Sequence, residues 1–315
     1  MVNLRLDIPE DFYKEEVRSG YTVTEDMKKV WAVELDLCAE LDRVCRKYDI
    51  KYCADSGTLL GAIRHRGFIP WDDDMDLGML RSEYKRLEAI APYEFNYPYF
   101  WQTEETDPGT ARGHAQLRNS LTTGILRTDY DNRRNNNFNQ GIFIDIFPFD
   151  NLPDNKKEIH TTRKRCSTLC RKYHDVLDNS LYYYNCVIED EKGRKHYGIK
   201  RKIKHWFYKN FGISYKKYYD ELVTVCQSYD DIEDNTFVAD LFFGVAGGFR
   251  YKEDFSELVE TDFEFIKIPV FRNAGRNLEI IYGSDYMIPR IEDNIHGKVI
   301  FDTDRPYTYY LGMRN

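Results

Sequence analysis

Long apolar segments are absent from this chain of 315 residues. No run approaches the roughly 18 consecutive apolar residues that form a membrane-spanning helix. Residues 1–7 contain no apolar stretch of the kind found at the centre of a signal peptide. We therefore expect a cytoplasmic protein, and peripheral association with the inner face of a membrane stays open.

An excess of positive charge is also absent. Lys and Arg number 45 against 53 Asp and Glu, which gives a formal net charge of −8. Proteins that bind nucleic acid without sequence preference normally carry a basic surface, so we expect no nucleic-acid partner. One basic tract, residues 201–209, is interpreted as a solvated helix face, with a membrane surface or an anionic glycan as alternative partners.

Cysteine spacings typical of zinc sites are absent, although the chain has seven cysteines. No two C-x₂-C halves occur together. Cys166 and Cys170 are four residues apart and could share a helix face, but no further metal ligand follows them closely. We interpret all seven as reduced, mostly buried thiols in a reducing compartment. They are Cys38, Cys45, Cys53, Cys166, Cys170, Cys186 and Cys226.

The hydrophobic pattern of the first half of the chain predicts helices and strands in mixed order. Apolar residues recur every three to four positions over 24–48, and Thr24 or Asp26 can cap this helix. Further predicted elements are a strand at 50–54, a helix at 56–64, a turn at 66–71, a strand at 74–80, a helix at 82–90, strands at 114–118, 121–127 and 142–147, and a loop at 131–137.

The second half of the chain predicts more helix. Residues 156–232 read as helices rich in Lys, Arg and Tyr, and 236–315 as short strands with a helix near 273–282. We predict an α/β (α+β) fold, with a mixed-sheet core and flanking helices. Residues 1–150 would form the catalytic core with its N-terminal helix. Residues 151–315 would form a mainly helical region that packs on this core and shapes the acceptor site.

Asp74 and Asp76 carry the strongest chemical signal. In the predicted strand they alternate with Met75 and Leu77, so both carboxylates lie on one face and both apolar side chains on the other. Two adjacent carboxylates repel each other unless a cation lies between them. Mg²⁺, with Mn²⁺ as the alternative, prefers such oxygen ligands, so we predict a metal site here. The two preceding aspartates would shape the turn or support the metal ligands.

The turn Ser56-Gly57-Thr58 lies between a predicted strand and a predicted helix. Backbone N–H groups at a helix N-terminus favour an anion, so we expect this turn to bind phosphate. Arg64 and His65 are further candidates for phosphate contacts, with exposed surface charge as the alternative interpretation. Arg118 is a weaker candidate for the same nucleotide-binding role.

A third carboxylate is expected beside the metal, and Asp145 is the best candidate. It lies in the apolar run Ile142–Phe147, where a buried carboxylate is costly without a partner or a metal. It would hold a metal or accept the proton of an attacking hydroxyl. The alternative is a buried aspartate with ordinary hydrogen bonds. Asp150 ranks lower because it closely follows Pro148.

Three motifs resemble the LicD family of phosphotransferases, which is itself similar to the fukutin-type enzymes. The longest is the run DSGTLLGAIRHRGFIPWDDDMD at 55–76, and two shorter ones lie at 144–148 and 282–287. The long motif is highly specific, and the short ones support it. Together they indicate coverage from about residue 30 to 290, although 150–270 contains no further motif of the family.

The resemblance implies a nucleotidyltransferase-like fold. It also implies Mg²⁺-dependent transfer of phosphocholine, or a related phospho-alcohol, from a CDP-activated donor (CDP-choline above all) to a hydroxyl of a cell-surface glycan or glycolipid. On the family pattern Asp74 and Asp76 match the metal ligands, Asp145 matches the third carboxylate, and Gly57 and Thr58 match the phosphate-binding turn.

Two other functions fit the same residues. A nucleotidyltransferase would attach the nucleoside monophosphate itself to an acceptor, and a non-catalytic relative would only bind nucleotide or glycan. The 25 Tyr and 19 Phe favour an aromatic-rich core, with a groove for a sugar or a cationic head group as the alternative. The sequence does not distinguish choline, ethanolamine, an aminophosphonate or a polyol as the transferred group, and it indicates no oligomeric state.

Overall fold

A computed structural model describes residues 1–126, 138–180, 187–189, 195–197, 199–212, 214–242, 248–291 and 299–311. The loop predicted at 131–137 lies outside these residues. None of the described helices is long and apolar enough to cross a bilayer.

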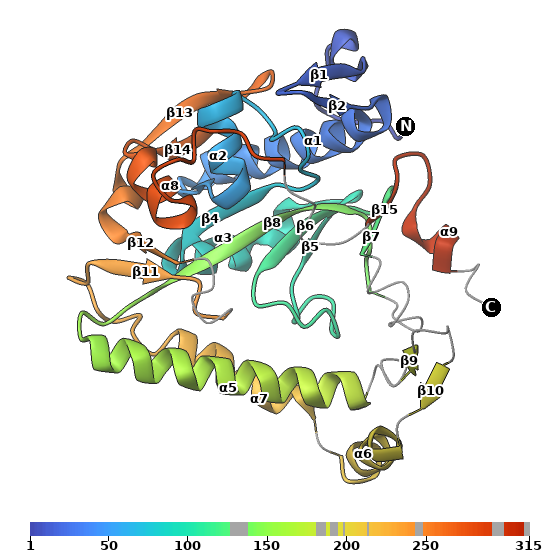
Figure 1. Ribbon diagram of the computed structural model, residues 1–315, viewed down its shortest axis with the longest axis vertical. Coiled ribbons are helices and arrows are strands. Elements are labelled where there is room, and N and C mark those ends of the chain that lie inside the picture. Colours follow the sequence, from blue (N-terminus) through green and yellow to red (C-terminus); the bar gives the residue numbers. More distant parts are fainter. Residues whose placement is uncertain are drawn as a thin grey trace.

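The main sheet is built around β8 (Ile142–Asn151), which crosses the middle of the molecule (Figure 1). Its first half pairs antiparallel with β6 (Ala115–Asn119), and its second half pairs parallel with β4 (Asp76–Leu80). Its last two residues pair with β11 (Phe237–Ala239). The sheet has seven strands in the order β12-β11-β8-β4-β3, with β6 and β5 branching from β8. The other members are β3 (Cys53–Ala54), β5 (Tyr99–Gln102) and β12 (Phe249–Tyr251).

Side chains alternate between the two faces of β8, as the period of a strand requires. Ile142, Ile144 and Ile146 are fully buried in the main hydrophobic core. Phe143, Asp145 and Phe147 point to the other face, where they line a cavity. One face of the sheet is therefore buried in the main hydrophobic core, and the other face lines the cavity.

Helices from both ends of the chain cover this core. α1 (Glu25–Tyr48) packs against β8 and β6, and it begins where the hydroxyl of Thr24 accepts the N–H of Met27 at 3.2 Å. α1 ends at Asp49, which has the left-handed φ of 50° common at helix C-termini. The other helices of this core are α2 (Ser56–His65), α3 (Arg81–Glu94) and α8 (Ala274–Tyr282).

A second, smaller hydrophobic core lies between α5 (Lys156–Ser180) and α7 (Tyr215–Cys226), which run side by side below the sheet (Figure 1). α6 (Ile199–Asn210) contacts the end of α5. The remaining elements are η1 (Glu10–Tyr13), β1 (Glu16–Arg18), β2 (Tyr21–Val23), β7 (Thr123–Leu126), β9 (Val187–Glu189), β10 (Lys195–Tyr197), η3 (Lys252–Ser256), β13 (Leu258–Phe263), β14 (Ile266–Phe271), β15 (Val299–Asp302) and α9 (Tyr307–Leu311).

The predicted fold class is confirmed: the structure has a mixed sheet with flanking helices. The predicted helices at 24–48, 56–64, 82–90 and 273–282 are present, with bounds that differ by a few residues. One difference lies within 156–232, where the β9–β10 hairpin interrupts the predicted helices. Such short strands have too few residues to show a period.

The division of the chain at residue 150 stays a prediction. Beyond it, α5 and α7 form their own core, but β11 and β12 extend the main sheet. Phe255, Phe271 and Leu278 are buried in the main core with residues of the first half. The segment after residue 236 thus returns to the main sheet and core.

Two buried ion pairs connect distant parts of the chain. Arg81 at the start of α3 donates two hydrogen bonds to Asp150 of β8, at 2.7 and 3.0 Å, and Asp150 is completely buried. Arg250 of β12 donates two hydrogen bonds of 2.8 Å to Asp55, the residue before α2. A paired, buried carboxylate is compatible with the core, whereas an unpaired one is strongly unfavourable.

We predict that Arg81→Met destabilises the protein by about 3–5 kcal/mol, because it leaves Asp150 buried without its partner. The double variant Arg81→Met/Asp150→Leu should recover most of this loss. Urea denaturation measures both effects. Lys85→Met is the matched control: it breaks an ion pair with Asp230 that is partly exposed, and should cost about 1 kcal/mol or less. Equal losses for Arg81→Met and Lys85→Met would contradict the interpretation.

Candidate active site

Three carboxylates meet where β4 and β8 run side by side. One oxygen from each of Asp74, Asp76 and Asp145 lies within 4.8 Å of the other two. The parallel register places Asp76 opposite Asp145, and the N–H of Asp145 donates to the carbonyl of Met75 at 2.8 Å. Met75 and Leu77 are fully buried on the opposite face. The predicted alternation is therefore present, although β4 begins at Asp76 rather than Asp74.

The three carboxyl groups are not electrostatically equivalent. Burial, with the neighbouring Asp145, raises the pKa of Asp74 to about 7. Burial and the charges of Asp74 and Asp145 raise the pKa of Asp76 well above its ordinary value. Burial alone would raise the pKa of Asp145 too, but the charge and hydrogen bond of His114 lower it. All-carboxylate donors that repel one another in this way suit a hard divalent cation such as Mg²⁺.

Two side chains orient Asp145: Gln116 of β6, and His114, the residue before β6. Nε2 of His114 lies 2.9 Å from Oδ1 of Asp145, and the amide of Gln116 donates to the same oxygen at 2.6 Å. Because an ionised carboxylate only accepts hydrogen bonds, His114 donates through Nε2 when Asp145 is charged. The sequence analysis did not identify either residue. The alternation of His114, Gln116 and Arg118 with apolar residues in the predicted strand was the available signal.

Arg118 lies behind this group and does not line the cavity. Its side chain is almost completely buried and covers the ring of Phe143. Its guanidinium donates to Gly141 O at 2.6 Å, to the side chain of Gln102 and to Oε1 of Gln116. The last bond turns the amide nitrogen of Gln116 toward Asp145. The predicted phosphate contact of Arg118 stays untested, and this position is unfavourable for it.

The Ser56-Gly57-Thr58 turn forms the N-terminus of α2, as predicted, and is bonded to the carboxylate strand. The hydroxyl of Thr58 accepts the N–H of Asp76 at 2.8 Å. Ser56 has a φ of 45° and donates its hydroxyl to Asp55 at 3.0 Å. A Cβ on Gly57 would lie 2.7 Å from a carboxylate oxygen of Asp72, so glycine allows that carboxylate to approach the helix. Phosphate binding by this turn stays a prediction.

Arg64 and His65 lie elsewhere, at the C-terminal end of α2. Arg64 donates to the carbonyl of Tyr286 at 2.7 Å and lines a separate cavity of about 110 Å³. Burial and the neighbouring arginines lower the pKa of His65 to about 4, so its ring is neutral at pH 7. A neutral imidazole attracts phosphate weakly, and neither residue lines the carboxylate cavity. Their predicted phosphate contacts stay untested.

The carboxylates form one part of a cavity of about 430 Å³. Phe143, Phe147, Tyr173 and Phe301 supply aromatic surface, and Arg112 is the cationic side chain among the described residues that line it. Its other polar lining residues are Glu34, Asp73, Thr110, His114, Gln116 and His174. Burial and the nearby aspartates raise the pKa of Glu34 well above its ordinary value. The cavity therefore combines a site for a cation with surface for an organic group.

The loop that carries Arg112 is held by tyrosines of the helical region. Tyr173 of α5 donates to Ala111 O at 3.0 Å, and Tyr219 of α7 donates to Arg112 O at 2.8 Å. Glu104 accepts the N–H of Ala111 at 2.8 Å and holds this residue, whose φ of 54° is unusual for alanine. The helical region thus shapes one wall of the cavity.

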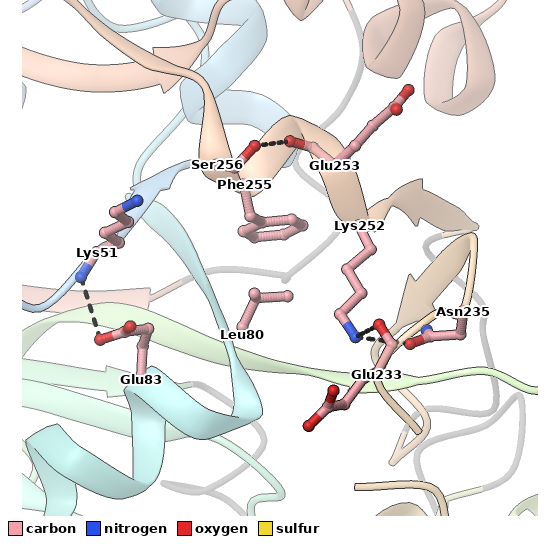
Figure 2. A pocket seen from close by; sticks show the side chains of 9 residues that line it. All are labelled: Lys51, Leu80, Glu83, Glu233, Asn235, Lys252, Glu253, Phe255 and Ser256. Atoms are coloured by element: carbon pink, nitrogen blue, oxygen red, sulfur yellow. Dashed lines mark hydrogen bonds between the residues drawn. The ribbon is translucent and has the colours of Figure 1, made fainter. Parts of the chain in front are cut away.

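A second cavity of about 420 Å³ lies elsewhere and has a different character (Figure 2). Lys252, one of its charged groups, is engaged within the protein: it donates to Glu233 O and to Asn235 at 2.8 and 2.7 Å. Glu83 accepts the backbone N–H of Lys51 at 3.4 Å (Figure 2). Among the described residues that line this second cavity, no three carboxylates lie as close together as those around Asp145. The carboxylate cavity is therefore the candidate active site.

Comparison with known proteins supports this choice of site. Residues 49–178, which carry Asp74, Asp76, His114 and Asp145, match the family described as LicD/FKTN/FKRP, nucleotidyltransferase domain. The chain is 28% identical over 258 residues to the lipopolysaccharide cholinephosphotransferase LicD of Haemophilus influenzae. That alignment covers 79% of this chain and 87% of the relative.

Shorter similarities involve two bacterial proteins of undescribed activity. An uncharacterized protein of Rickettsia prowazekii is 45% identical over 56 residues, which are 18% of this chain and 21% of that protein. An uncharacterized protein of Rickettsia typhi is 43% identical over 56 residues, 18% of each chain. The long alignment and the family match over the carboxylate site together show that this chain is similar to proteins of the LicD family.

Proposed function

We propose that this chain is a Mg²⁺-dependent phosphotransferase. It would transfer phosphocholine, or a related phospho-alcohol, from a CDP-activated donor to a hydroxyl of a glycan or glycolipid. The observation that carries the proposal is the cluster of Asp74, Asp76 and Asp145 in a cavity large enough for an organic substrate. The activity named for the Haemophilus relative supports the same reaction class.

The reaction is an in-line displacement at the phosphorus that carries the alcohol. The acceptor oxygen forms a new P–O bond, the bond to CMP breaks, and CMP leaves with the electron pair. A cation held by Asp74, Asp76 and Asp145 would neutralise charge that develops on the phosphate oxygens. Arg112 contributes positive charge in the cavity, and the carboxylate oxygen of Asp145 that does not hold the cation would receive the hydroxyl proton.

The cavity lining supports a cationic alcohol. A quaternary ammonium group binds to aromatic faces, and Phe147, Tyr173 and Phe301 supply these beside Asp73. A polyol would instead need several hydrogen-bonding partners. Choline is therefore the alcohol that this lining suits best.

Two competing functions can be separated by experiment. Nucleotidyl transfer would leave a nucleotide on the acceptor, whereas the proposed reaction releases free CMP, so product analysis by mass spectrometry decides between them. A non-catalytic binder would take up CDP-choline in a Mg²⁺-dependent way in calorimetry without turnover on any glycan tested. CMP release with phosphocholine on the glycan is the outcome that we expect.

We predict that Asp74→Asn and Asp76→Asn each lower transferase activity by about a hundredfold or more, since a metal contributes several kcal/mol to the transition state. The assay is Mg²⁺-dependent CMP release from CDP-choline. Asp230→Asn, at the partly exposed ion pair with Lys85, is the matched control and should keep full activity. Thermal unfolding checks that all variants fold. Full activity in both folded site variants would refute the assignment.

Mg²⁺ should stabilise the protein more at pH 8 than at pH 6. The pKa of Asp74 is raised from 3.8 to about 7, so folding favours its protonated form. In the metal-free protein this carboxyl therefore contributes less stability as the pH rises from about 4 to 7. A cation must displace the proton below pH 7, and it needs no such displacement above it.

The measurement for this prediction is the Mg²⁺-induced shift in melting temperature at the two pH values. Asp76→Asn should abolish the shift at both. A shift that is equal at pH 6 and pH 8, or larger at pH 6, would contradict the assignment of the cation to these carboxylates.

Gln116 and Arg118 are positioning residues in this account. Gln116→Leu should lower activity or Mg²⁺ affinity by about 10- to 100-fold, because partners of metal ligands typically have effects of this size. Arg118→Met should act through Gln116, so the double variant should be no less active than the worse single variant. Unchanged activity together with unchanged Mg²⁺ affinity in Gln116→Leu would show that the bond to Asp145 has no functional role. Additive losses in the double variant would show that Arg118 acts independently of Gln116.

A further inference from the structure

α6 exposes a continuous apolar face to solvent. Ile199, Ile203 and Trp206 are 74%, 61% and 59% exposed, which is unusual for large apolar side chains on one helix. Phe207 and Phe211 extend the same surface, with their ring centroids 4.6 Å apart. Figure 1 shows α6 at the periphery of the molecule, beyond the end of α5.

The opposite side of α6 attaches it to the protein. Tyr208 donates to Asp175 of α5 at 2.9 Å, and Lys204 also binds Asp175. The ring of His205 lies 2.6 Å from the carbonyl oxygen of Asn179. Successive residues of an α-helix are about 100° apart, so this attached side lies opposite the side that carries Ile199, Ile203 and Trp206. The apolar face is therefore directed away from the body of the protein.

Exposed lysines border the apolar face. On the same helical geometry, Lys200 lies at one edge, and Lys202 and Lys209 lie at the other. An apolar stripe with Trp and Phe between rows of lysine is typical of helices that lie in a membrane interface. The positive charge is confined to this part of the surface, since the chain as a whole has a net charge of −8. An anionic surface would thus attract this face and repel most of the rest.

We propose that α6 docks the protein on the surface of a membrane that contains anionic lipids. The aromatic and aliphatic side chains would enter the boundary between head groups and acyl chains, while the lysines contact lipid phosphates. The helix is 12 residues long, which is too short to span a bilayer, so it would lie along the membrane surface. This inference does not rest on the proposed transferase activity. For the basic tract at 201–209 it favours the membrane surface, one of the alternatives to a solvated face that the sequence left open.

Other occupants fit these features less well. A second copy of α6 packed on the first would bring the bordering lysines of both copies together, which is unfavourable. A stable dimer also needs about 800 Å² from each partner, more than one face of a 12-residue helix provides. An anionic glycan would engage the lysines but would leave Ile199, Ile203 and Trp206 in water.

The test is co-sedimentation of the full chain with vesicles of phosphatidylcholine alone or mixed with phosphatidylglycerol. We expect binding to the mixed vesicles that weakens with salt, and little binding to phosphatidylcholine alone. Trp206→Ser/Phe207→Ser should lower the apparent affinity about tenfold or more, and Lys200→Gln/Lys209→Gln should do so for mixed vesicles in particular. Tyr93→Ser is the matched control, since Tyr93 is 81% exposed but lies on α3.

Tryptophan fluorescence locates the contact. Brominated lipids should quench part of the emission of the wild-type protein, and Trp206→Phe should remove that part, because Trp31 and Trp101 are buried and Trp71 is partly buried against the main core, away from α6. Circular dichroism confirms that each variant is folded. The proposal is overturned by absence of binding to the mixed vesicles, or by equal binding of Trp206→Ser/Phe207→Ser and Tyr93→Ser. It is also overturned if the wild type dimerises in solution through these same residues.

Discussion

The parallel pairing of β4 with β8 is the interaction on which the candidate site depends. Its register places Asp76 beside Asp145 and leaves Asp74 two residues upstream, so that three carboxylates converge on one sheet face. Burial makes this convergence unfavourable for the charged forms, as the raised pKa of Asp74 and Asp76 shows. A bound cation would reverse the sign of that interaction. Relief of the repulsion between these carboxylates would therefore contribute to the free energy of metal binding.

The rest of the structure holds these strands in register. Arg81 and Asp150 connect α3 to the end of β8, and Arg250 reaches from β12 to Asp55, beside the Ser56-Gly57-Thr58 turn that opens α2. Arg118, through Gln116, orients Asp145 from behind. Each of these arginines is buried and bonded to the protein. Their role in the site is to place carboxylates, which differs from the role of Arg112 in the cavity lining.

Much of the site could be predicted from local pattern. Asp74, Asp76 and Asp145 were identifiable because strand alternation and an acidic residue in an apolar run are local signals. The functions of His114 and Gln116 depend on the antiparallel register of β6 with β8, and register is set by pairing between distant segments. Arg64 and His65 are close in sequence to the turn predicted to bind phosphate, but α2 places them one helix length from it in space, and their predicted phosphate contacts stay untested.

The central claim is that Asp74, Asp76 and Asp145 bind one divalent cation between them. Anomalous diffraction from crystals grown with Mn²⁺ and CDP-choline tests it most directly. We expect a metal peak about 2.1 Å from carboxylate oxygens of these residues, with the donor phosphates beside it. A Mn²⁺ ion and a bound nucleotide found at another site, with this cluster empty, would contradict it.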